Sequence, residues 1–165
     1  MKLFKTFAAP VLLLVLLVFA SGTAQAQDTR SFGLTALIQN GQAEILVPLW
    51  LGDALTLAPG FSLLYIENNT MEIGLLLMPR FYLDMQRVAP YISARGGVIF
   101  RMPDSPLQSD TTDILLGMGF GGEYFVNAMF SFGVEAQLNG FVVDISGISD
   151  ITLRTAAAVH ANVYF

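Results

Sequence analysis

The chain has 165 residues, of which 54% are hydrophobic, and its formal net charge is −5 at pH 7. It has no cysteine and one histidine, which excludes thiol chemistry and a tetrahedral metal site built from cysteine and histidine ligands. An acidic chain with few cations is poorly suited to nucleic acid, because binding phosphates requires a cationic patch. We therefore expect no cofactor, no metal site and no nucleic-acid partner.

The N-terminal segment has the layout of a secretory signal peptide. Lys2 and Lys5 precede an apolar stretch that ends in small residues up to Ala26. A membrane-spanning helix needs about 20 apolar residues, and a proline interrupts this stretch. We therefore predict export with cleavage after Ala26, which gives a signal peptide at 1–26 and a single domain at 27–165.

The rest of the chain alternates apolar and polar residues with a period of two, the pattern of β-strands. Clusters of Gly, Asn, Asp and Pro separate the alternating segments and predict turns. In chain order the segments are 31–39, 43–51, 55–66, 71–83, 90–102, 114–126, 130–141 and 151–165. An even number of such segments predicts an all-β fold, an eight-stranded antiparallel up-and-down β-barrel.

Sorting each segment by odd and even positions separates two faces. One face carries no charged residue and is rich in Leu, Ile, Val and Phe. The opposite face mixes small residues with the charges of the segments and with the single histidine, and we interpret it as a polar network. Its members are Glu44, Glu72, Arg80, Arg95, Arg101, Glu123, Glu135, Arg154 and His160.

Alternation alone leaves open which face points inward. A soluble lipocalin-like barrel in the periplasm would hold an apolar ligand inside, whereas a transmembrane barrel turns its apolar face to lipid and its polar face to the lumen. The absence of lysine from the polar face favours the membrane, and so do the glycines beside the charges, which make room in a narrow lumen. Aromatic residues also gather toward two rims, with Phe32, Phe81 and Phe165 near one and Tyr65 and Phe100 near the other, as interfacial girdles do.

The connections give an independent indication. If both ends of the barrel chain are periplasmic, the short turns at 52–54, 84–89 and 127–129 fall on the periplasmic side. The longer stretches at 103–113 and 142–150 then fall on the outer side. Short periplasmic turns and longer outer loops are typical of outer-membrane barrels.

Three prolines conflict with the predicted strands. Pro48, Pro59 and Pro79 lie inside segments, where each removes a donor from the hydrogen-bond ladder. Such a loss is poorly tolerated in lipid. We therefore expect β-bulges at these prolines.

Two stretches resemble known proteins. "GMGFGGEYFVNAMFSFGVEAQLNGF" (117–141) resembles the Gly-rich strand, tight turn and following strand of small bacterial outer-membrane barrels of the OmpA-barrel and OmpX-like kind, and "APYISARGGVIF" (89–100) is similar to their preceding strand. Phe165, with Val159 and Val163 on the same face, resembles their C-terminal assembly signal, although that family often has an aromatic residue where Val163 stands.

The resemblance implies a location and partners. It implies a porin-family type of protein in the outer membrane of a Gram-negative cell, inserted by the outer-membrane assembly machinery. It also implies a monomer in contact with outer-membrane lipid and lipopolysaccharide.

The sequence offers little for catalysis. Lipid A deacylases of this fold pair a histidine with a serine two residues away, but Ala158 and Asn162 stand at those distances from His160. Because an eight-stranded barrel is just wide enough for side chains to fill it, we interpret the charged face as structural packing. The predicted function is a non-enzymatic role in envelope integrity or surface interaction. A soluble ligand-binding barrel, a narrow ion or small-solute channel and a lipid A-modifying enzyme remain alternatives.

Overall fold

The structure is a computed structural model that describes residues 31–66, 70–103, 110–145 and 148–165. The predicted signal peptide at 1–26 lies outside these residues. Within the described part of the chain, no helix is long and apolar enough to cross a membrane.

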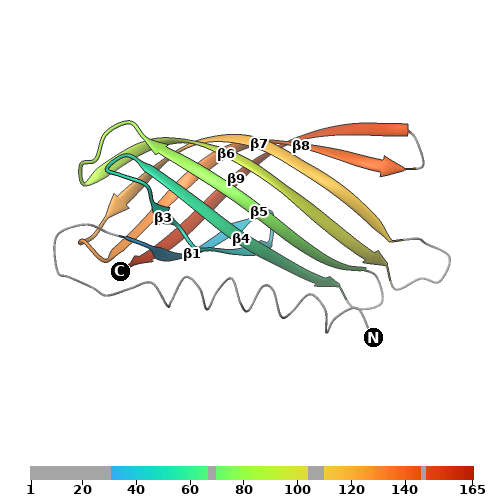
Figure 1. Ribbon diagram of the computed structural model, residues 1–165, viewed down its shortest axis with the longest axis horizontal. Helices are drawn as coiled ribbons and strands as arrows, with labels where there is room; N and C mark the ends of the chain where they lie inside the picture. Colours follow the sequence, from blue (N-terminus) through green and yellow to red (C-terminus); the bar gives the residue numbers. More distant parts are fainter. Residues whose placement is uncertain (1–30, 67–69, 104–109, 146–147) are drawn as a thin grey trace.

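The described residues form one closed antiparallel sheet (Figure 1). Its strands are β1 (Gly33–Gln39), β2 (Gln42–Leu46), β3 (Leu49–Trp50), β4 (Leu55–Ile66), β5 (Thr70–Tyr82), β6 (Val88–Pro103), β7 (Thr111–Phe125), β8 (Phe130–Ile145) and β9 (Ile148–Tyr164). β1 pairs with β2 on one side and with β9 on the other, which closes the sheet into a barrel. β2 and β3 are two pieces of one strand, because both pair with β4 in a single register. The predicted eight-stranded antiparallel barrel is therefore confirmed.

The second predicted strand, 43–51, is interrupted at Pro48. Proline has no amide hydrogen to donate to a ladder, so the paired residues stop at Leu46 and resume at Leu49. The backbone stays in place across the break, because Gly33 N donates a hydrogen bond to the Pro48 carbonyl at 2.8 Å and Val47 N donates to the Pro59 carbonyl at 2.8 Å.

The predicted bulges at the prolines are wrong. Pro59 pairs with Leu77 in an unbroken β4–β5 ladder. The β5–β6 ladder omits only Met78 and Pro79 and continues in the same register on both sides. Neither proline is accompanied by an extra residue in its strand, so the alternation of faces is preserved along both strands.

The predicted outer loop at 142–150 is also wrong. β8 and β9 remain paired as far as Ile145 opposite Ile148. Their hairpin reaches beyond the neighbouring strands in Figure 1. β-branched residues dominate this stretch, among them Val142, Val143 and Ile151, and their preference for strands outweighs the turn signal of the nearby Asp and Gly residues.

The short connections lie at one end of the barrel, as predicted, whereas most of the longer stretch predicted at 103–113 lies outside the described residues. We call one end the turn end, because it holds the short connections 51–54, 83–87 and 126–129. Backbone hydrogen bonds from Phe125 N to Arg87 O (2.9 Å) and from Tyr164 N to Met129 O (2.7 Å) fasten two of these connections to the ends of neighbouring strands. We call the other end the loop end. It holds the β1–β2 turn, where Asn40 and Gly41 both have positive φ, the conformation of a two-residue hairpin turn.

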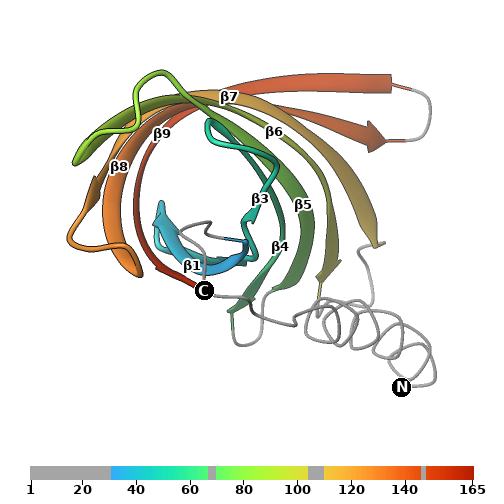
Figure 2. The same ribbon diagram turned by 60° about the vertical axis from the view of Figure 1, so that its left-hand side comes forward.

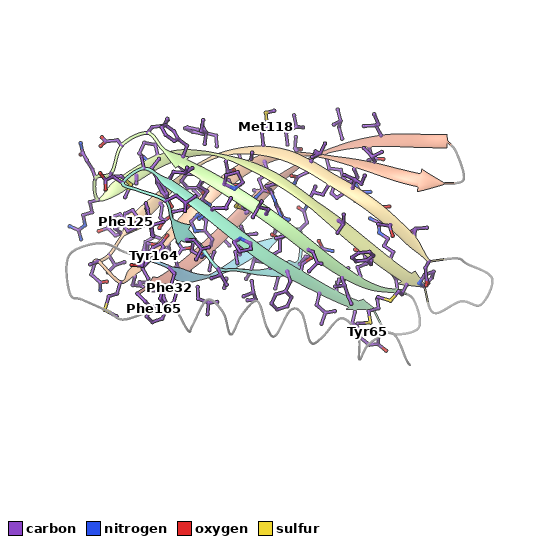
Figure 3. All side chains as sticks on the ribbon, viewed as in Figure 1. Phe32, Tyr65, Met118, Phe125, Tyr164 and Phe165 are labelled. Carbon is purple, nitrogen blue, oxygen red and sulfur yellow. The ribbon has the colours of Figure 1, made fainter. Side chains whose placement is uncertain are left out.

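The barrel is apolar outside and polar inside. The outward side chain of Met118 (64% exposed) projects away from the wall (Figure 3). Leu153 is likewise 69% exposed. Inward side chains such as Glu123 (0% exposed) and Glu135 (2% exposed) are enclosed. Figure 3 also places Phe32 and Phe165 at one end of the barrel and Tyr65 near the other, the distribution that the sequence predicted for the two rims.

Candidate functional site: the barrel interior

The interior is the part of the molecule that concentrates polar chemistry. Because successive side chains of a strand alternate between faces, the uninterrupted registers bring the polar face of every strand into one enclosed space. The buried polar side chains are Thr35, Gln39, Glu44, Thr56, Arg80, Ser93, Arg95, Asp113, Glu123, Ser131, Glu135, Gln137, Asn139, His160 and Asn162.

Glu123 organises the turn end of the interior. Its Oε2 accepts a hydrogen bond from the Tyr82 hydroxyl at 2.7 Å and lies 3.7 Å from Arg80 Nη1. Its Oε1 accepts from the Ser131 hydroxyl at 2.5 Å and from the Tyr164 hydroxyl at 2.7 Å. A buried carboxylate is stable only when it is paired and hydrogen-bonded, and both oxygens of Glu123 meet that condition.

Arg80 lies between two carboxylates. Besides its contact with Glu123, its Nε is 3.8 Å from Glu135 Oε2, and its guanidinium carbon is 5.0 Å from the centre of the Tyr91 ring. The guanidinium is therefore held by two acids and an aromatic face. Glu135 also accepts hydrogen bonds from Ser93 at 3.0 Å and from Gln137 at 2.8 Å.

His160 is enclosed in the same network. Its Nε2 is 2.9 Å from the Tyr91 hydroxyl, and its Nδ1 is 3.1 Å from Asn162 Nδ2. Asn162 also accepts a hydrogen bond from Thr35 at 2.6 Å and donates one to Ser131 at 2.8 Å. Both ring nitrogens have partners, and the Ser131 hydroxyl donates to Glu123 rather than to the imidazole. Nucleophilic catalysis needs a hydroxyl or thiol hydrogen-bonded to its base. The hydroxyl that contacts the imidazole here belongs to Tyr91, whose side chain is fully buried and therefore closed to a substrate.

Five aromatic side chains fill the interior at the turn end. Trp50 stacks on Tyr82 with ring centres 5.2 Å apart, Tyr82 contacts Tyr91 at 5.5 Å, and Tyr164 contacts both Trp50 at 5.8 Å and Phe125 at 6.1 Å. We call this group the aromatic cluster. This cluster was not predicted from the sequence. Alternation contains a signal for it, because Tyr82 and Tyr91 share their faces with charged residues of the same strands.

Arg95 joins three strands in the middle of the barrel. Its Nη2 donates to both oxygens of Glu44, each at 2.7 Å, in a bidentate ion pair. Its Nη1 donates to Gln39 at 2.8 Å and to Gln137 at 2.6 Å. Because these partners lie on β1, β2 and β8, the one guanidinium ties opposite walls of the lumen together.

The charged residues nearest the loop end are less enclosed. Arg101 Nε is 2.9 Å from Glu72, and its Nη1 is 2.5 Å from the buried Asp113. The side chains of Arg101 and Glu72 are 30% and 21% exposed. Arg154, the remaining predicted member of the network, is exposed, and its guanidinium carbon lies 5.3 Å from the centre of the Phe141 ring.

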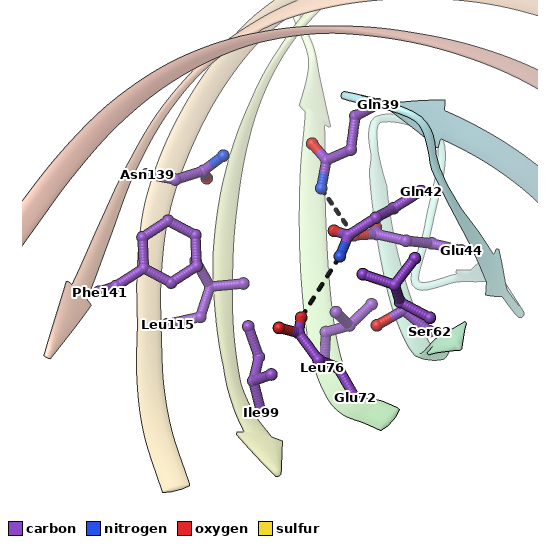
Figure 4. Close-up of a pocket in the computed structure, with 11 residues that line it drawn as sticks. Gln39, Gln42, Glu44, Ser62, Glu72, Leu76, Ile99, Leu115, Asn139 and Phe141 are labelled. Atoms are coloured by element: carbon purple, nitrogen blue, oxygen red, sulfur yellow. Dashed lines mark hydrogen bonds between the residues drawn. The ribbon is translucent and has the colours of Figure 1, made fainter. Parts of the chain in front are cut away.

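Apolar side chains also point inward, which the sequence analysis did not predict. Leu37, Leu46, Ala58, Leu76, Met78, Leu115 and Ala158 form a buried cluster, and Ile99 and Phe141 pack against it. Beside them lies a cavity of about 30 Å³, which we call the loop-side pocket (Figure 4). It is lined by Gln39, Gln42, Glu44, Ser62, Leu64, Glu72, Leu76, Ile99, Leu115, Asn139 and Phe141.

The residues predicted as an assembly signal lie on the outer face. Val159, Val163 and Phe165 are exposed. The Phe165 ring stacks on Phe32 at 5.3 Å, and the Phe165 carbonyl accepts a hydrogen bond from Ser31 N at 3.0 Å. These contacts help to close the seam between β1 and β9, and recognition by the assembly machinery stays a prediction.

This chain is similar in fold to proteins of known structure. No family model and no curated protein matches the chain. Among solved structures, Neisserial surface protein A (NspA) has a TM-score of 0.61 and 16% identity, covering 81% of this chain and 93% of that one. The N-terminal β-barrel domain of Pseudomonas aeruginosa OprF has a TM-score of 0.60 and 14% identity, covering 86% of this chain and 100% of that one. The chain therefore has the fold of the small eight-stranded outer-membrane β-barrels, as the sequence resemblance implied.

Proposed function

We propose that this protein is a monomeric, non-enzymatic outer-membrane barrel that supports the integrity of the cell envelope. The observation that carries the proposal is the inverted distribution of side chains. Large apolar residues cover the outer face, whereas carboxylates and guanidinium groups are buried inside. Soluble monomers rarely expose apolar patches larger than a few hundred Å², but a lipid-facing barrel requires such a surface.

Strand length is consistent with a span of the bilayer. A transmembrane strand needs about 9–11 tilted residues. The six strands from β4 to β9 exceed this length, from 12 residues in β4 to 17 in β9, whereas β1 has 7. Over the height at which β1 and β2 are paired with their neighbours, the closed sheet also satisfies the backbone amides and carbonyls within the wall, which a hydrocarbon environment demands.

The contacts inside the barrel support a structural role. Glu123, Arg95 and His160 are each occupied by neighbouring side chains, so their polar groups stabilise the wall. The aromatic cluster fills the lumen at the turn end, and we therefore expect no measurable conductance in planar bilayers. The same polar filling argues against a soluble barrel that binds an apolar ligand at its centre.

A matched pair of substitutions tests the membrane location. Met118 and Met129 are similarly exposed, at 64% and 59%, but Met118 faces outward from β7 and Met129 lies in a connection at the turn end. On the lipid face near the bilayer midplane, arginine costs about 2–4 kcal/mol. We expect Met118→Arg to lower the free energy of unfolding in lipid vesicles by that amount and Met129→Arg to change it little.

Fractionation and gel mobility complete the test. The protein is expected in the outer-membrane fraction and should migrate differently on a denaturing gel before and after boiling. Recovery as a monodisperse protein without detergent, with Met118→Arg as stable as Met129→Arg, would contradict the proposal.

A further inference from the structure

The barrel wall is lower above the β1–β2 hairpin than elsewhere. β9 pairs with β1 only up to Ala158 opposite Gln39, and β4 pairs with β2 only up to Ser62 opposite Glu44. Toward the loop end, β4 and β9 both continue without a partner on that side among the described residues, whereas β1 is visibly short (Figure 2). We call the interval between residues 63–66 of β4 and 148–157 of β9 the notch.

The apolar outer surface continues to the edges of the notch. Ile38 below it is 54% exposed, Leu63 on β4 is 51% exposed, and Leu153 on β9 points outward. The notch therefore faces the same medium as the rest of the wall. Unpaired backbone at membrane depth is tolerated where it is buried in protein or lines a water-filled cavity. The unpaired edges of β4 and β9 therefore require water or polar headgroup atoms beside them rather than hydrocarbon.

The loop-side pocket lies directly behind the notch. Gln39 and Gln42 flank the turn of the hairpin that forms the floor of the notch, and Leu64 belongs to the strand at its side. The far wall of the pocket includes the ring of Phe141 on β8 (Figure 4). A lumen filled only by water would not need this apolar wall, which is suited to hydrocarbon.

The charged residues around the pocket differ in whether they form an ion pair. Glu44 and Glu72, the two carboxylates that line it, are paired with Arg95 and Arg101 respectively. Arg154 on β9, at the side of the notch, is exposed and stacks over the Phe141 ring, and it forms no ion pair with a carboxylate of the described residues. An unneutralised cation thus lies beside an apolar wall.

The size of the pocket limits its occupant. Its volume of about 30 Å³ is enough for one or two water molecules. It accommodates only a short segment of a hydrocarbon chain, and the rest of the molecule must remain in the notch and in the surrounding leaflet.

We propose that the notch admits an anionic lipid from the surrounding leaflet, with the headgroup beside Arg154 and the acyl-chain segment nearest the headgroup against Phe141 and Leu64. The inference rests on the proposed membrane location. It goes further, because it assigns one lateral position on the barrel to one class of lipid. The three observations that carry it are the interrupted pairing, the apolar wall of the pocket and the free cation.

Tryptophan quenching by brominated lipids tests the proposal. Trp50, the chain's one tryptophan, is first replaced by phenylalanine (Trp50→Phe), and each reporter is introduced into that variant. Phe141→Trp then reports from the pocket, and Phe120→Trp reports from the outer face, where Phe120 is 59% exposed. The protein is reconstituted in vesicles of unlabelled phosphatidylcholine. To these vesicles a second lipid with bromines on its acyl chain is added, either phosphatidylglycerol or phosphatidylcholine. Trp50 of the unaltered protein, in the aromatic cluster, serves as the interior control.

We expect strong quenching of Phe120→Trp by both lipids and little quenching of Trp50. Phe141→Trp should be quenched at an about fivefold lower fraction of brominated phosphatidylglycerol than of brominated phosphatidylcholine, the factor that one cation near an anionic lipid provides. Arg154→Gln should abolish this preference and leave the quenching of Phe120→Trp unchanged.

The outcomes separate the two proposals. If Phe120→Trp is quenched but Phe141→Trp is not, the notch excludes lipid and this inference is wrong, while the membrane location stands. If neither reporter is quenched, the proposed function itself fails. Equal quenching of Phe141→Trp by both lipids would overturn the role of Arg154. Leu64→Trp, from the strand at the side of the notch, is the second reporter if Phe141→Trp fails to fold, and boiling-dependent mobility checks the folding of each variant.

Discussion

The two ends of the interior are built from the same alternation but differ in enclosure. At the turn end, Glu123 is fully buried among tyrosine hydroxyls and Arg80. At the loop end, Glu72 and Arg101 are partly exposed. β1 ends before it reaches the level of Arg154, so no residue of β1 lies opposite that side chain. Most charged residues near the loop end are therefore less buried than those at the turn end, although Asp113, which pairs with Arg101, is fully buried. The barrel combines a sealed half with a half that is less enclosed.

The largest expected effect comes from breaking the sealed half at Glu123. Glu123→Leu would leave two tyrosine hydroxyls, a serine hydroxyl and Arg80 without their shared acceptor. Removing one partner of a buried charge pair costs about 3–5 kcal/mol, and we expect this loss in the free energy of unfolding. Urea unfolding in lipid vesicles, followed by gel mobility, measures it. Glu123→Gln retains an acceptor oxygen and should lose less. A loss below about 1 kcal/mol for the leucine variant would show that these donors find other partners.

A pair of glycine substitutions compares a position where an added Cβ would be crowded with a position where it would meet no neighbouring atom. A Cβ at Gly133 would lie 2.5 Å from His160 Nε2 and 2.6 Å from the Gly122 carbonyl, whereas a Cβ at Gly96 meets nothing within 4 Å. Overpacking a filled interior costs about 1–3 kcal/mol, so Gly133→Ala should lower the midpoint of urea unfolding. Gly96→Ala should leave it nearly unchanged. Equal effects would mean that the interior is not tightly packed around His160.

The smallest effect is expected at the open end. Glu72→Gln removes one carboxylate from Arg101, but Asp113 still pairs with that guanidinium. Partly exposed ion pairs contribute about 0–1 kcal/mol, so the same unfolding experiment should show a change within that range. A loss as large as that of Glu123→Gln would mean that the loop end is as enclosed as the turn end, and the contrast between the halves would disappear.

Alternation predicted most of the fold and of the polar network. The strands, the two faces and the sides of the short turns follow from a period of two, which local sequence reveals. The extended β8–β9 hairpin did not follow, because pairing between Val142 and Ile151 depends on a neighbour distant in sequence. The strand register could not be predicted from the sequence either, because no local pattern indicates that a ladder continues unshifted past Pro59 and Pro79.

The site was predicted less completely, for a related reason. Its charged residues stand out by residue type, but the inward positions of Leu76 and Leu115 are informative only once the lumen is known to be otherwise polar. The exposure of Arg154 could not be predicted from β9 alone. It depends on β1 ending at Gln39, which is decided by the Asn40–Gly41 turn on a different strand.

The β1–β9 seam has a consequence for the order of folding. The hydrogen bond between the Thr35 and Asn162 side chains joins residues separated by 127 positions in sequence. Contacts between distant residues are slow to form, because the entropy of closing the loop is lost before the contact stabilises it. The other strands join in sequence order through hairpins, so closure of this seam is the step that waits for all of them. A kinetic intermediate of this protein should be an open sheet with its first and last strands unpaired.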